Sequence, residues 1–393
     1  MSIIFVFTTY LFFLHHYFVD AQDQTYLQAQ QKFSLELFSN VSGPDYSAGV
    51  ILSPIIIDFS LSLLLIGSSG NTFKQLLFGL QYPANYSINL IEINSNLMIK
   101  NMINAGGIEY GIKIYVDKKL SLQNNFKTAI QKYFNSGIET VDFAQKFQSV
   151  QTINDFISNS THGMIQNVMT PDELDSQTSM ILVNCIYFKG AWVNPFNKNN
   201  TEQMDFKLDK INTTKIDFMK IKTDFKYGAV DTLNGAKVVE LPYVNSSVTL
   251  TLILPQEVDG LKNLITAARN YDWSKLSENL KNKKVLLIMP KFNATFGLNL
   301  NQAIENMGMD SIFYPSIANI DRVAHKNGKP YLISLEKMYH KVIISVDEYG
   351  TTAAAVSTAN KISTPVVFQA NQPFLYALRS NSTIYFIGQF TGK

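Results

Sequence analysis

The sequence is short of cysteine, of charged residues and of any excess of one charge sign, and each shortage excludes a class of protein. Its single cysteine, Cys185, excludes an intramolecular disulfide framework and a cysteine-based zinc cluster. The 33 basic residues against 31 acidic ones leave no basic surplus of the kind that a dedicated nucleic-acid binder carries. Only 16% of the residues are charged whereas 46% are hydrophobic, so the chain has enough apolar material to fold rather than remain disordered.

The N-terminal segment is apolar but short. The run from Ile3 to Leu14 is too short to span a bilayer, which disfavours a membrane anchor, and a buried first helix is the other alternative. Val19 to Ala21 then gives a small-residue pattern suited to signal peptidase. We therefore expect residues 1–21 to be a signal peptide, cleaved before Gln22, and the mature protein to be secreted into the extracellular space. Since no linker, charge block or repeat follows, we expect residues 22–393 to form one domain.

The sequence contains N-glycosylation sequons, which agree with secretion, although many of them arise by chance in a chain so rich in asparagine. They lie at Asn40, Asn85, Asn159, Asn199, Asn212, Asn245, Asn293 and Asn381. In an oxidising compartment a lone thiol is expected to be buried and inert, and we expect this of Cys185.

Helical patterns dominate the first half of the sequence and strand patterns the second. Pro54 to Ile66, closed by Gly67, predicts a buried helix, and the spacing of Ile153 and Ile157 predicts an amphipathic helix that runs towards Met164. The strand candidates are Ile181–Phe188, Val248–Leu254, Val285–Met289, Val342–Val346 and Ile384–Ile387. This order indicates an α+β protein with mostly antiparallel sheets.

Motifs of catalysis are missing from the sequence. The histidines after the signal segment, His162, His325 and His340, are scattered, and no zinc-protease, nucleophile-elbow or phosphate-loop motif occurs. A secreted hydrolase stays open as an alternative, because a Ser-His-Asp triad needs only to meet in space. We nevertheless expect no enzyme, no cofactor and no metal site, and we expect His340, just before a strand, to be a core histidine.

The segment after that strand is a run of small and β-branched residues from Glu348 to Ala359. Gly350 can adopt backbone angles closed to other residues and so can act as a hinge. The residues after it are small enough to slide between strands that are already packed. The run continues to near Pro365, and a loop of that length usually has a function.

With these residues the sequence resembles the serpin superfamily over nearly the whole mature chain. The pattern Glu348-x-Gly350-Thr351-x-Ala353-Ala354-Ala355 is similar to the family's inhibitory hinge, and Asn184 to Gly190, followed by Trp192 and Phe196, is similar to its internal motif. Further fragments occur in the family's order: Ser53-Pro54, Glu240 to Tyr243, Pro290 to Phe292, His340-Lys341 and Pro373 to Leu375.

The resemblance implies the α+β serpin fold, with a large central sheet, two further sheets, surrounding helices and an exposed reactive-centre loop at about residues 350–368. It also implies a suicide inhibitor: a serine protease cuts the loop, and the cut loop inserts into the central sheet with the protease attached. The expected partner is one target protease in a 1:1 covalent complex with a monomer, without nucleic acid or membrane. Asn94 to Asn104 lacks a cluster of basic residues, so no heparin site is expected.

The resemblance also implies roles for two groups of residues. Ser53, Asn184 and His340 match the cluster beneath the point where the central strands part, which we call the sheet-opening cluster. Trp192, Lys291 and Glu348 match the place where the loop enters, which we call the loop-insertion site, and an ion pair between Lys291 and Glu348 would be partly desolvated. The sequence departs from the family at Ile56, where a second serine is usual.

The scissile residue depends on the direction of counting. Counting forward from Glu348 places it at Thr364, but Pro365 would then follow the bond. Counting back from Pro373 places it at Ile362, so the loop is about two residues shorter than usual.

We place Ile362 ahead of Lys361 and Ser363 as the scissile residue, and Thr364 remains a fourth candidate. A short loop favours release of the protease over trapping. A non-inhibitory serpin, acting as an extracellular carrier or interaction protein, is therefore the alternative, and the small residues of the hinge argue against it.

Overall fold

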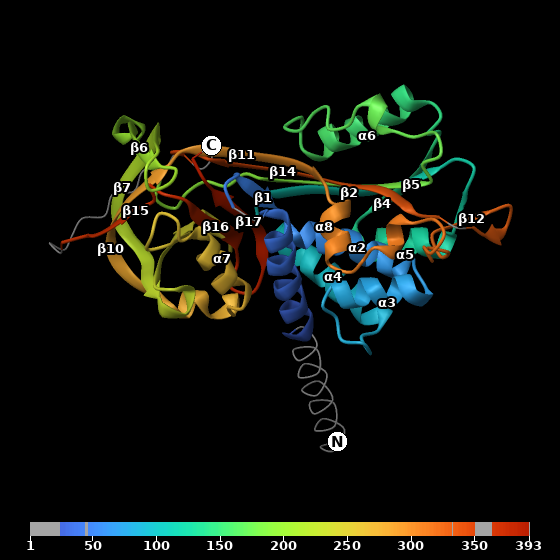
Figure 1. Cartoon of the computed structure of the whole chain (residues 1–393), viewed down its shortest axis with the longest axis horizontal. Coiled ribbons are helices and arrows are strands. Elements are labelled where there is room, and N and C mark those ends of the chain that lie inside the picture. The colour runs from blue at the N-terminus through green and yellow to red at the C-terminus, as the bar shows by residue number, and fades with distance from the viewer. Residues whose placement is uncertain (1–23, 44–45, 332, 350–363, 393) are drawn as a thin grey trace, which may run out of the picture.

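The computed structural model describes residues 24–43, 46–331, 333–349 and 364–392, which form three sheets with helices around them. Figure 1 shows a five-stranded sheet along the upper side of the molecule, with α6 on its outer face and α2 to α5 beneath it. The α-helices are residues 24–41, α2 (Pro54–Ile66), α3 (Gly70–Gly79), α4 (Ile88–Asn104), α5 (Asn124–Phe134), α6 (Lys146–Ser160), α7 (Leu261–Arg269) and α8 (Asn301–Asn306). Short 3-10 helices occupy η1 (Pro171–Glu173), η2 (Lys198–Asn200), η3 (Asp231–Leu233), η4 (Trp273–Asn279) and η5 (Ser311–Phe313).

The five-stranded sheet has the strand order β11-β14-β5-β2-β4. Its strands are β2 (Ile108–Asp117), β4 (Gly137–Val141), β5 (Met180–Phe188), β11 (Phe292–Asn299) and β14 (Leu335–Val346). Strands β14 and β5 are parallel, as are β2 and β4, whereas β11 with β14 and β2 with β5 are antiparallel.

The nine-stranded sheet has the order β1-β17-β16-β9-β8-β7-β10-β15, with β6 paired to β7. Its strands are β1 (Val50–Leu52), β6 (Glu202–Lys207), β7 (Thr213–Val230), β8 (Ala236–Pro242), β9 (Thr249–Leu254), β10 (Lys281–Pro290), β15 (Val366–Gln369), β16 (Phe374–Arg379) and β17 (Ile384–Phe390). The third sheet joins β3 (Ser121–Leu122), β12 (Ala324–Lys326) and β13 (Lys329–Pro330). These three sheets, with their helices, confirm the predicted α+β class.

Helix α2 lies at the centre of the molecule, in contact with β5 of one sheet and β17 of the other. Pro54 begins it, because its fixed φ suits the first helical position and that position needs no N–H donor, and Gly67 follows its end. Every residue of α2 is buried, including Asp58 and two serines. The predicted helix is confirmed at both ends.

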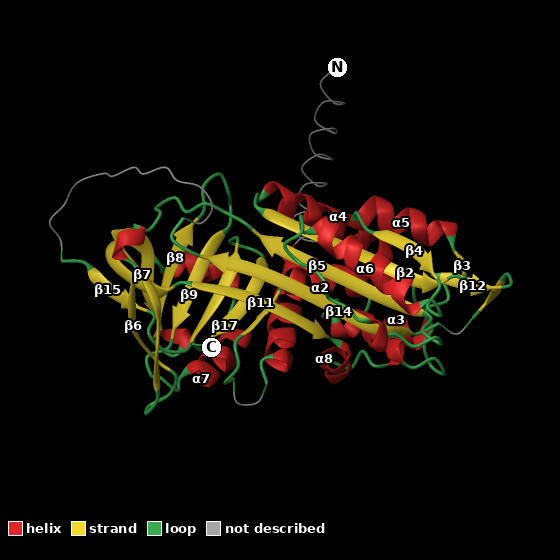
Figure 2. Cartoon of the chain, turned by 90° about the horizontal axis from the view of Figure 1, so that it is seen from above, coloured by secondary structure: helices red, strands yellow, loops and turns green. Residues whose placement is uncertain are grey.

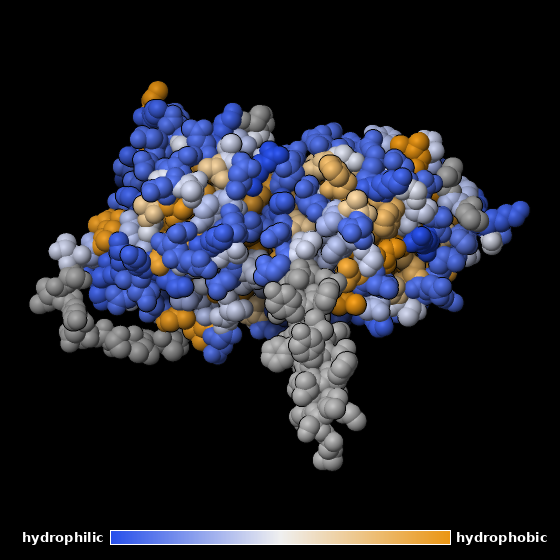
Figure 3. Space-filling model, turned by 90° about the horizontal axis from the view of Figure 1, so that it is seen from below, coloured by the Kyte–Doolittle hydropathy of each residue, from blue (hydrophilic) through white to orange (hydrophobic). Residues whose placement is uncertain are grey.

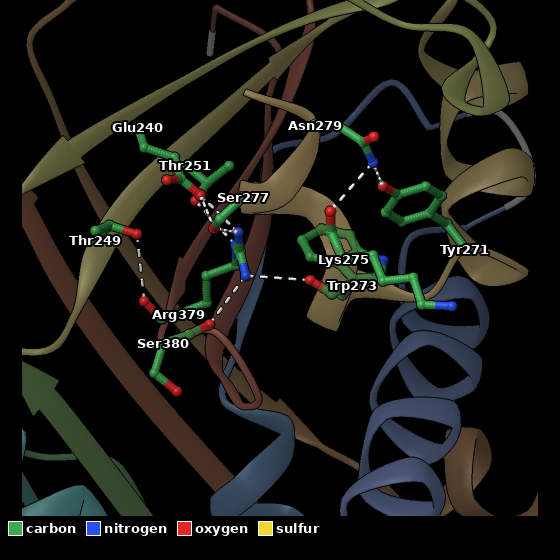
Figure 4. A network of polar contacts seen from close by, with 10 residues as sticks. All are labelled: Glu240, Thr249, Thr251, Tyr271, Trp273, Lys275, Ser277, Asn279, Arg379 and Ser380. Carbon is green, nitrogen blue, oxygen red and sulfur yellow. Dashed lines mark hydrogen bonds and ion pairs between the residues drawn. The ribbon is translucent and has the colours of Figure 1, made fainter. Parts of the chain in front are cut away.

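A buried ion pair and its hydrogen bonds tie β16 to β8 and η4 (Figure 4). Arg379 Nη2 lies 2.6 Å from Glu240 Oε1, and both side chains are at most 5% exposed. Ser277 and Thr251 hydroxyls accept hydrogen bonds from the same guanidinium, as does the Trp273 carbonyl. Because its N–H groups have partners, the guanidinium is stable here, and loss of either charged partner would leave the other buried and unpaired.

Three sequence-based expectations are corrected by the structure. His340 lies inside β14 rather than before a strand, because β14 begins at Leu335. Helix α6 ends at Ser160 instead of running towards Met164, because His162 and Gly163 adopt positive φ angles that close it. Helices and strands are also interleaved along the chain: β2 and β4 lie in the first half and belong to the same sheet as β14.

The face of the molecule that Figure 3 shows is mainly hydrophilic, with scattered hydrophobic residues. Of the helices in the described part of the chain, none has both the length and the apolar character that a membrane span requires.

Candidate functional site

The two parallel strands β14 and β5 lie side by side in the middle of the five-stranded sheet (Figure 2). Their pairing runs from Leu335 opposite Met180 to Ile344 opposite Phe188. His340 stands directly opposite Asn184, so two members of the predicted sheet-opening cluster face each other across this junction.

The structure brings all three residues of the sheet-opening cluster together. The backbone N–H of Ser53 donates to His340 Nε2 at 3.1 Å, and His340 Nδ1 lies 2.5 Å from Asn184 Oδ1. The Ser53 hydroxyl donates to the carbonyl of Tyr385 on β17 at 2.6 Å. The cluster therefore links the junction of β14 and β5 to the start of α2 and to the nine-stranded sheet.

These contacts fix the protonation state of His340. Because Nε2 accepts a hydrogen bond from an N–H group, Nδ1 carries the proton and donates it to the Asn184 oxygen. Burial lowers the pKa of His340 to about 3, so the imidazole is neutral at physiological pH. With both nitrogens engaged, His340 is a structural link and not a general base.

Ser60 completes the cluster, one helical turn after the position where the family's second serine is missing. The Asn184 amide donates to Ser60 Oγ at 3.1 Å, and the Ser60 hydroxyl donates to the carbonyl of Ile56. Residues four apart lie on the same face of a helix. Ser60 can therefore supply, on the face of Ile56, the hydroxyl that the isoleucine side chain lacks. The sequence alone does not identify Ser60, because a serine in a mainly apolar helix gives no sign of its partner.

The loop-insertion site lies where β14 ends and the hinge segment begins. Lys291 Nζ is 2.8 Å from Glu348 Oε2, and Thr201 donates its hydroxyl to Glu348 Oε1, also at 2.8 Å. The Glu348 side chain is 2% exposed and that of Lys291 is 39% exposed, so the expected ion pair is present and half desolvated. Burial opposes ionisation of Glu348, but the hydrogen bonds from Lys291 and Thr201 outweigh it and lower the pKa of the carboxyl.

Trp192 anchors the same end of the sheet. Its indole N–H donates to the carbonyl of Asp347 at 2.8 Å, and its ring stacks on that of Tyr243 with the centroids 4.2 Å apart. The backbone N–H of Phe196 donates to the Glu348 carbonyl at 2.8 Å. The residues just before Gly350 are therefore held by both side-chain and backbone bonds.

The described residues hold no group of three or more His, Cys, Asp or Glu side chains that could bind a metal ion. Cys185 is fully buried, as expected, and burial raises the pKa of its thiol to about 12. A protonated thiol without solvent access is unreactive.

Comparison with known proteins assigns the family. Residues 28–392 match the serpin family, described as serine protease inhibitors. The Antitrypsin of Bombyx mori is 30% identical over 366 residues, which are 91% of this chain and 92% of that protein. The human Leukocyte elastase inhibitor is 29% identical, over 92% of this chain and 98% of its own length. The chain belongs to the serpin family.

The fold of this serpin is shared with solved structures. A crystal structure of Serpin48 from the insect Tenebrio molitor superposes with a TM-score of 0.83 at 24% identity and covers 94% of this chain and 99% of its own. The family is described by protease inhibition and not by an enzymatic activity.

Several predicted site residues lie outside the described part of this serpin. They are the hinge residues Gly350, Thr351, Ala353, Ala354 and Ala355 and the scissile candidates Lys361, Ile362 and Ser363. Thr364, the fourth candidate, is described and is exposed.

The predicted glycosylation sites lie at the surface. Seven of the sequon asparagines are exposed, and Asn40 is half-buried with its amide bonded to the Glu36 carbonyl. Their modification remains a prediction.

Proposed function

We propose that this serpin is a secreted suicide inhibitor of serine endopeptidases that traps one protease molecule in a covalent complex. The protease nucleophile attacks a loop peptide bond and forms an acyl-enzyme. The freed loop then enters the central sheet as a new strand between β5 and β14 and carries the protease with it. The observation that carries the proposal is that β5 and β14 are parallel neighbours and that the loop follows directly from β14.

Strand direction makes this junction a suitable place for insertion. A chain that leaves β14 after Val346 and turns back runs antiparallel to β14. Because β5 is parallel to β14, the same returning strand is antiparallel to β5 as well. Insertion would thus replace one parallel pairing by two antiparallel ones, at about 1 kcal/mol net for each added hydrogen bond.

Loop length agrees with the size of the junction. Strand β14 has 12 residues, which span about 40 Å at about 3.3 Å per residue. The segment from Gly350 to Ile362 has 13 residues and so matches that strand. Cleavage after Ile362 or Lys361 would free an arm of 13 or 12 residues, which is shorter than usual in the family but still as long as β14.

The sheet-opening cluster supplies a barrier to insertion before cleavage. Separating β5 from β14 pulls Asn184 away from His340, and both are buried without access to water that could replace the bond. A sheet held closed in this way is stable kinetically rather than thermodynamically. Energy stored in the closed sheet would drive the protease across the molecule.

Secretion rests on the N-terminal sequence and agrees with the exposed sequons. Expression of the full chain in a secreting eukaryotic cell would test it. We expect medium protein that begins at Gln22 and loses mass on treatment with an N-glycosidase. Protein retained in the cell with its first residues intact would contradict this part of the proposal.

Inhibition is tested by mixing the purified mature protein with trypsin-, chymotrypsin- and elastase-like proteases. We expect at least one of them to form an SDS-stable adduct whose mass is the sum of the protease and the N-terminal serpin fragment that ends at the scissile residue. Mass spectrometry of the released C-terminal peptide would identify the bond. A protease with its serine blocked is the control and should form no adduct. Cleavage by every protease without adduct would refute inhibition and favour the carrier alternative.

A further inference from the structure

Lysines gather on the solvent face of the nine-stranded sheet beside the C-terminal end of the reactive loop. Lys222 and Lys226 lie on β7 on either side of Asp224, and Lys284 on β10 stands opposite Asp224. Residues two apart on a strand share one face, so the three lysines surround a single carboxylate. We call this group the lysine face.

Only one of the three lysines of the lysine face is in an ion pair among the described residues. Lys284 pairs with Asp224, at 3.5 Å. Among the described residues, Lys222 and Lys226 have no acidic side chain within ion-pair distance, and both are exposed. The lysine face therefore carries a net charge of +2, from three lysines and one aspartate.

The register of β15 places the lysine face next to the loop. Strand β15 begins at Val366, which pairs with Val285 of β10 in parallel. Continued by one residue towards the N-terminus, this parallel register brings Pro365 level with Lys284, the residue before Val285 in β10. The described part of the loop thus reaches the sheet at its lysine-rich end, within a few residues of every scissile candidate.

Apolar side chains adjoin the lysines on the same face. Val367 of β15, which is 48% exposed, stands opposite Leu286 of β10, and Leu286 stands opposite Lys222 of β7. Three adjacent strands span about 10 Å between the outer two. An apolar centre with charged residues around it is the usual composition of a protein–protein interface.

We propose that the lysine face, with Val367 and Leu286, is a docking surface for an acidic region of the target protease. The inference rests on the proposed function in one respect only, that a protease attacks the loop. A protease bound at the loop covers about 800 Å² of its partner, roughly 16 Å in radius, and so reaches β10 and β7. Lysines at that distance attract an acidic protease and repel a basic one before the loop is engaged.

A protease fits this surface better than a sulfated polysaccharide does. The exposed Val367 beside Leu286 offers an apolar contact that a polyanion cannot use, and Asp224 and Glu202 interrupt the run of positive charge on these strands. The nearby loop brings a protease to this place in any case. The polysaccharide is kept as an outcome of the experiment below.

The test compares an anionic and a cationic trypsin, which share a preference for cleavage after Lys and Arg. An Ile362→Arg background offers both enzymes an arginine in the loop, and the readout is the second-order rate of loop cleavage. This rate does not require trapping, so it remains informative if no covalent adduct forms. A small chromogenic substrate corrects for effects of salt on the trypsins themselves.

The decisive variant is Lys222→Glu with Lys226→Glu. At about 0.1 M salt, where the Debye length is about 10 Å, we expect it to slow cleavage by anionic trypsin about tenfold, and at about 1 M salt the difference should nearly vanish. Cleavage by cationic trypsin should be unchanged or faster. The arginine variant, Lys222→Arg with Lys226→Arg, keeps the charge and should keep the original rates.

Lys100→Glu with Lys127→Glu is the matched control, because it changes the net charge equally on exposed positions of α4 and α5. If this control slows anionic trypsin as much as the lysine-face variant does, net charge and not docking is responsible. Equal rates for the lysine-face variant and the parent protein would overturn the proposal. So would a loss of heparin-column retention with unchanged cleavage rates, which would assign the surface to a polyanion.

Discussion

At the scale of single residues, Asp58 is the least expected feature of the molecule. It is the one acidic residue of an otherwise apolar helix, it is fully buried, and one of its carboxylate oxygens has no hydrogen-bond partner. The titratable groups that face it are tyrosine hydroxyls, Tyr26 from the first helix and Tyr82 from the segment after α3, with Tyr86 stacked on Tyr82. Burial raises the pKa of Asp58 to about 7, although bonds from Tyr82 and Tyr26 oppose this.

Asp58 should make folding stability depend on pH. The carboxyl has its ordinary pKa of 3.8 in the unfolded chain and about 7 in the folded protein, so between these values only the folded state keeps the proton. Its contribution is fully present below about pH 4 and is lost as the pH rises to about 7, on the order of 4 kcal/mol.

Asp58→Asn removes this titration while nearly keeping the shape of the side chain. We expect the variant to unfold at a higher urea concentration than the parent protein near pH 8 and at a similar one near pH 4. His340 titrates in both proteins, so its effect cancels in the difference. A difference that is the same at both pH values would show that Asp58 does not titrate as argued.

Asn184→Ala tests the link between the two central strands. The substitution leaves the buried Nδ1–H of His340 without an acceptor, and we expect a loss of about 1–3 kcal/mol in the free energy of unfolding. Asn282→Ala, on an exposed position of β10, is the matched control and should change stability little. Equal urea midpoints for the two variants would mean that the cluster does not hold the strands together.

At the scale of elements, the hinge should tolerate a bulky charge at alternate positions only. Side chains alternate between the two faces of a strand, so Thr351 and Thr352 would face opposite sides of the sheet after insertion. We expect Thr351 to face the core and Thr352 to face solvent. We expect Thr351→Arg to convert the inhibitor into a substrate, whereas Thr352→Arg should leave adduct formation nearly unchanged. Adduct yields on SDS gels measure both, and equal yields would contradict insertion.

Elements with strong local signals could be predicted from the sequence, whereas their partners could not. Helix α2 was predictable because Pro54 and Gly67 mark its ends and every residue between them, except Asp58, is apolar or small. Strand β14 was predicted too short, because Glu336, Lys337 and Lys341 hide its apolar alternation. The parallel pairing of β14 with β5 joins residues about 155 positions apart, for example His340 and Asn184, and no local pattern specifies such a contact.

The residues of the candidate site could likewise be predicted only in part. The resemblance to serpins supplied Ser53, Asn184 and His340, and the structure brings them together. Ser60 and Thr201 were missed, because a hydroxyl that serves a distant side chain looks in the sequence like any other serine or threonine.

At the scale of the whole molecule, the closed sheet is held kinetically, and it persists only while the loop is intact. The intact chain has a five-stranded sheet whose central pair is parallel, closed by a buried cluster at the junction and by an ion pair at its end. The central claim is that cutting the loop lets its proximal arm join this sheet as a sixth strand. The free energy gained on insertion would come from a dozen or so hydrogen bonds between strands. It should therefore raise the stability of the whole molecule.

Insertion can be measured by thermal unfolding of the intact protein and of a form nicked once in the loop. We predict that the nicked form, with both fragments still associated, melts roughly 10–20 °C higher, as expected for about a dozen additional hydrogen bonds in a protein of this size. A nicked form that melts at the same temperature as the intact protein would contradict insertion and, with it, the proposed mechanism of inhibition.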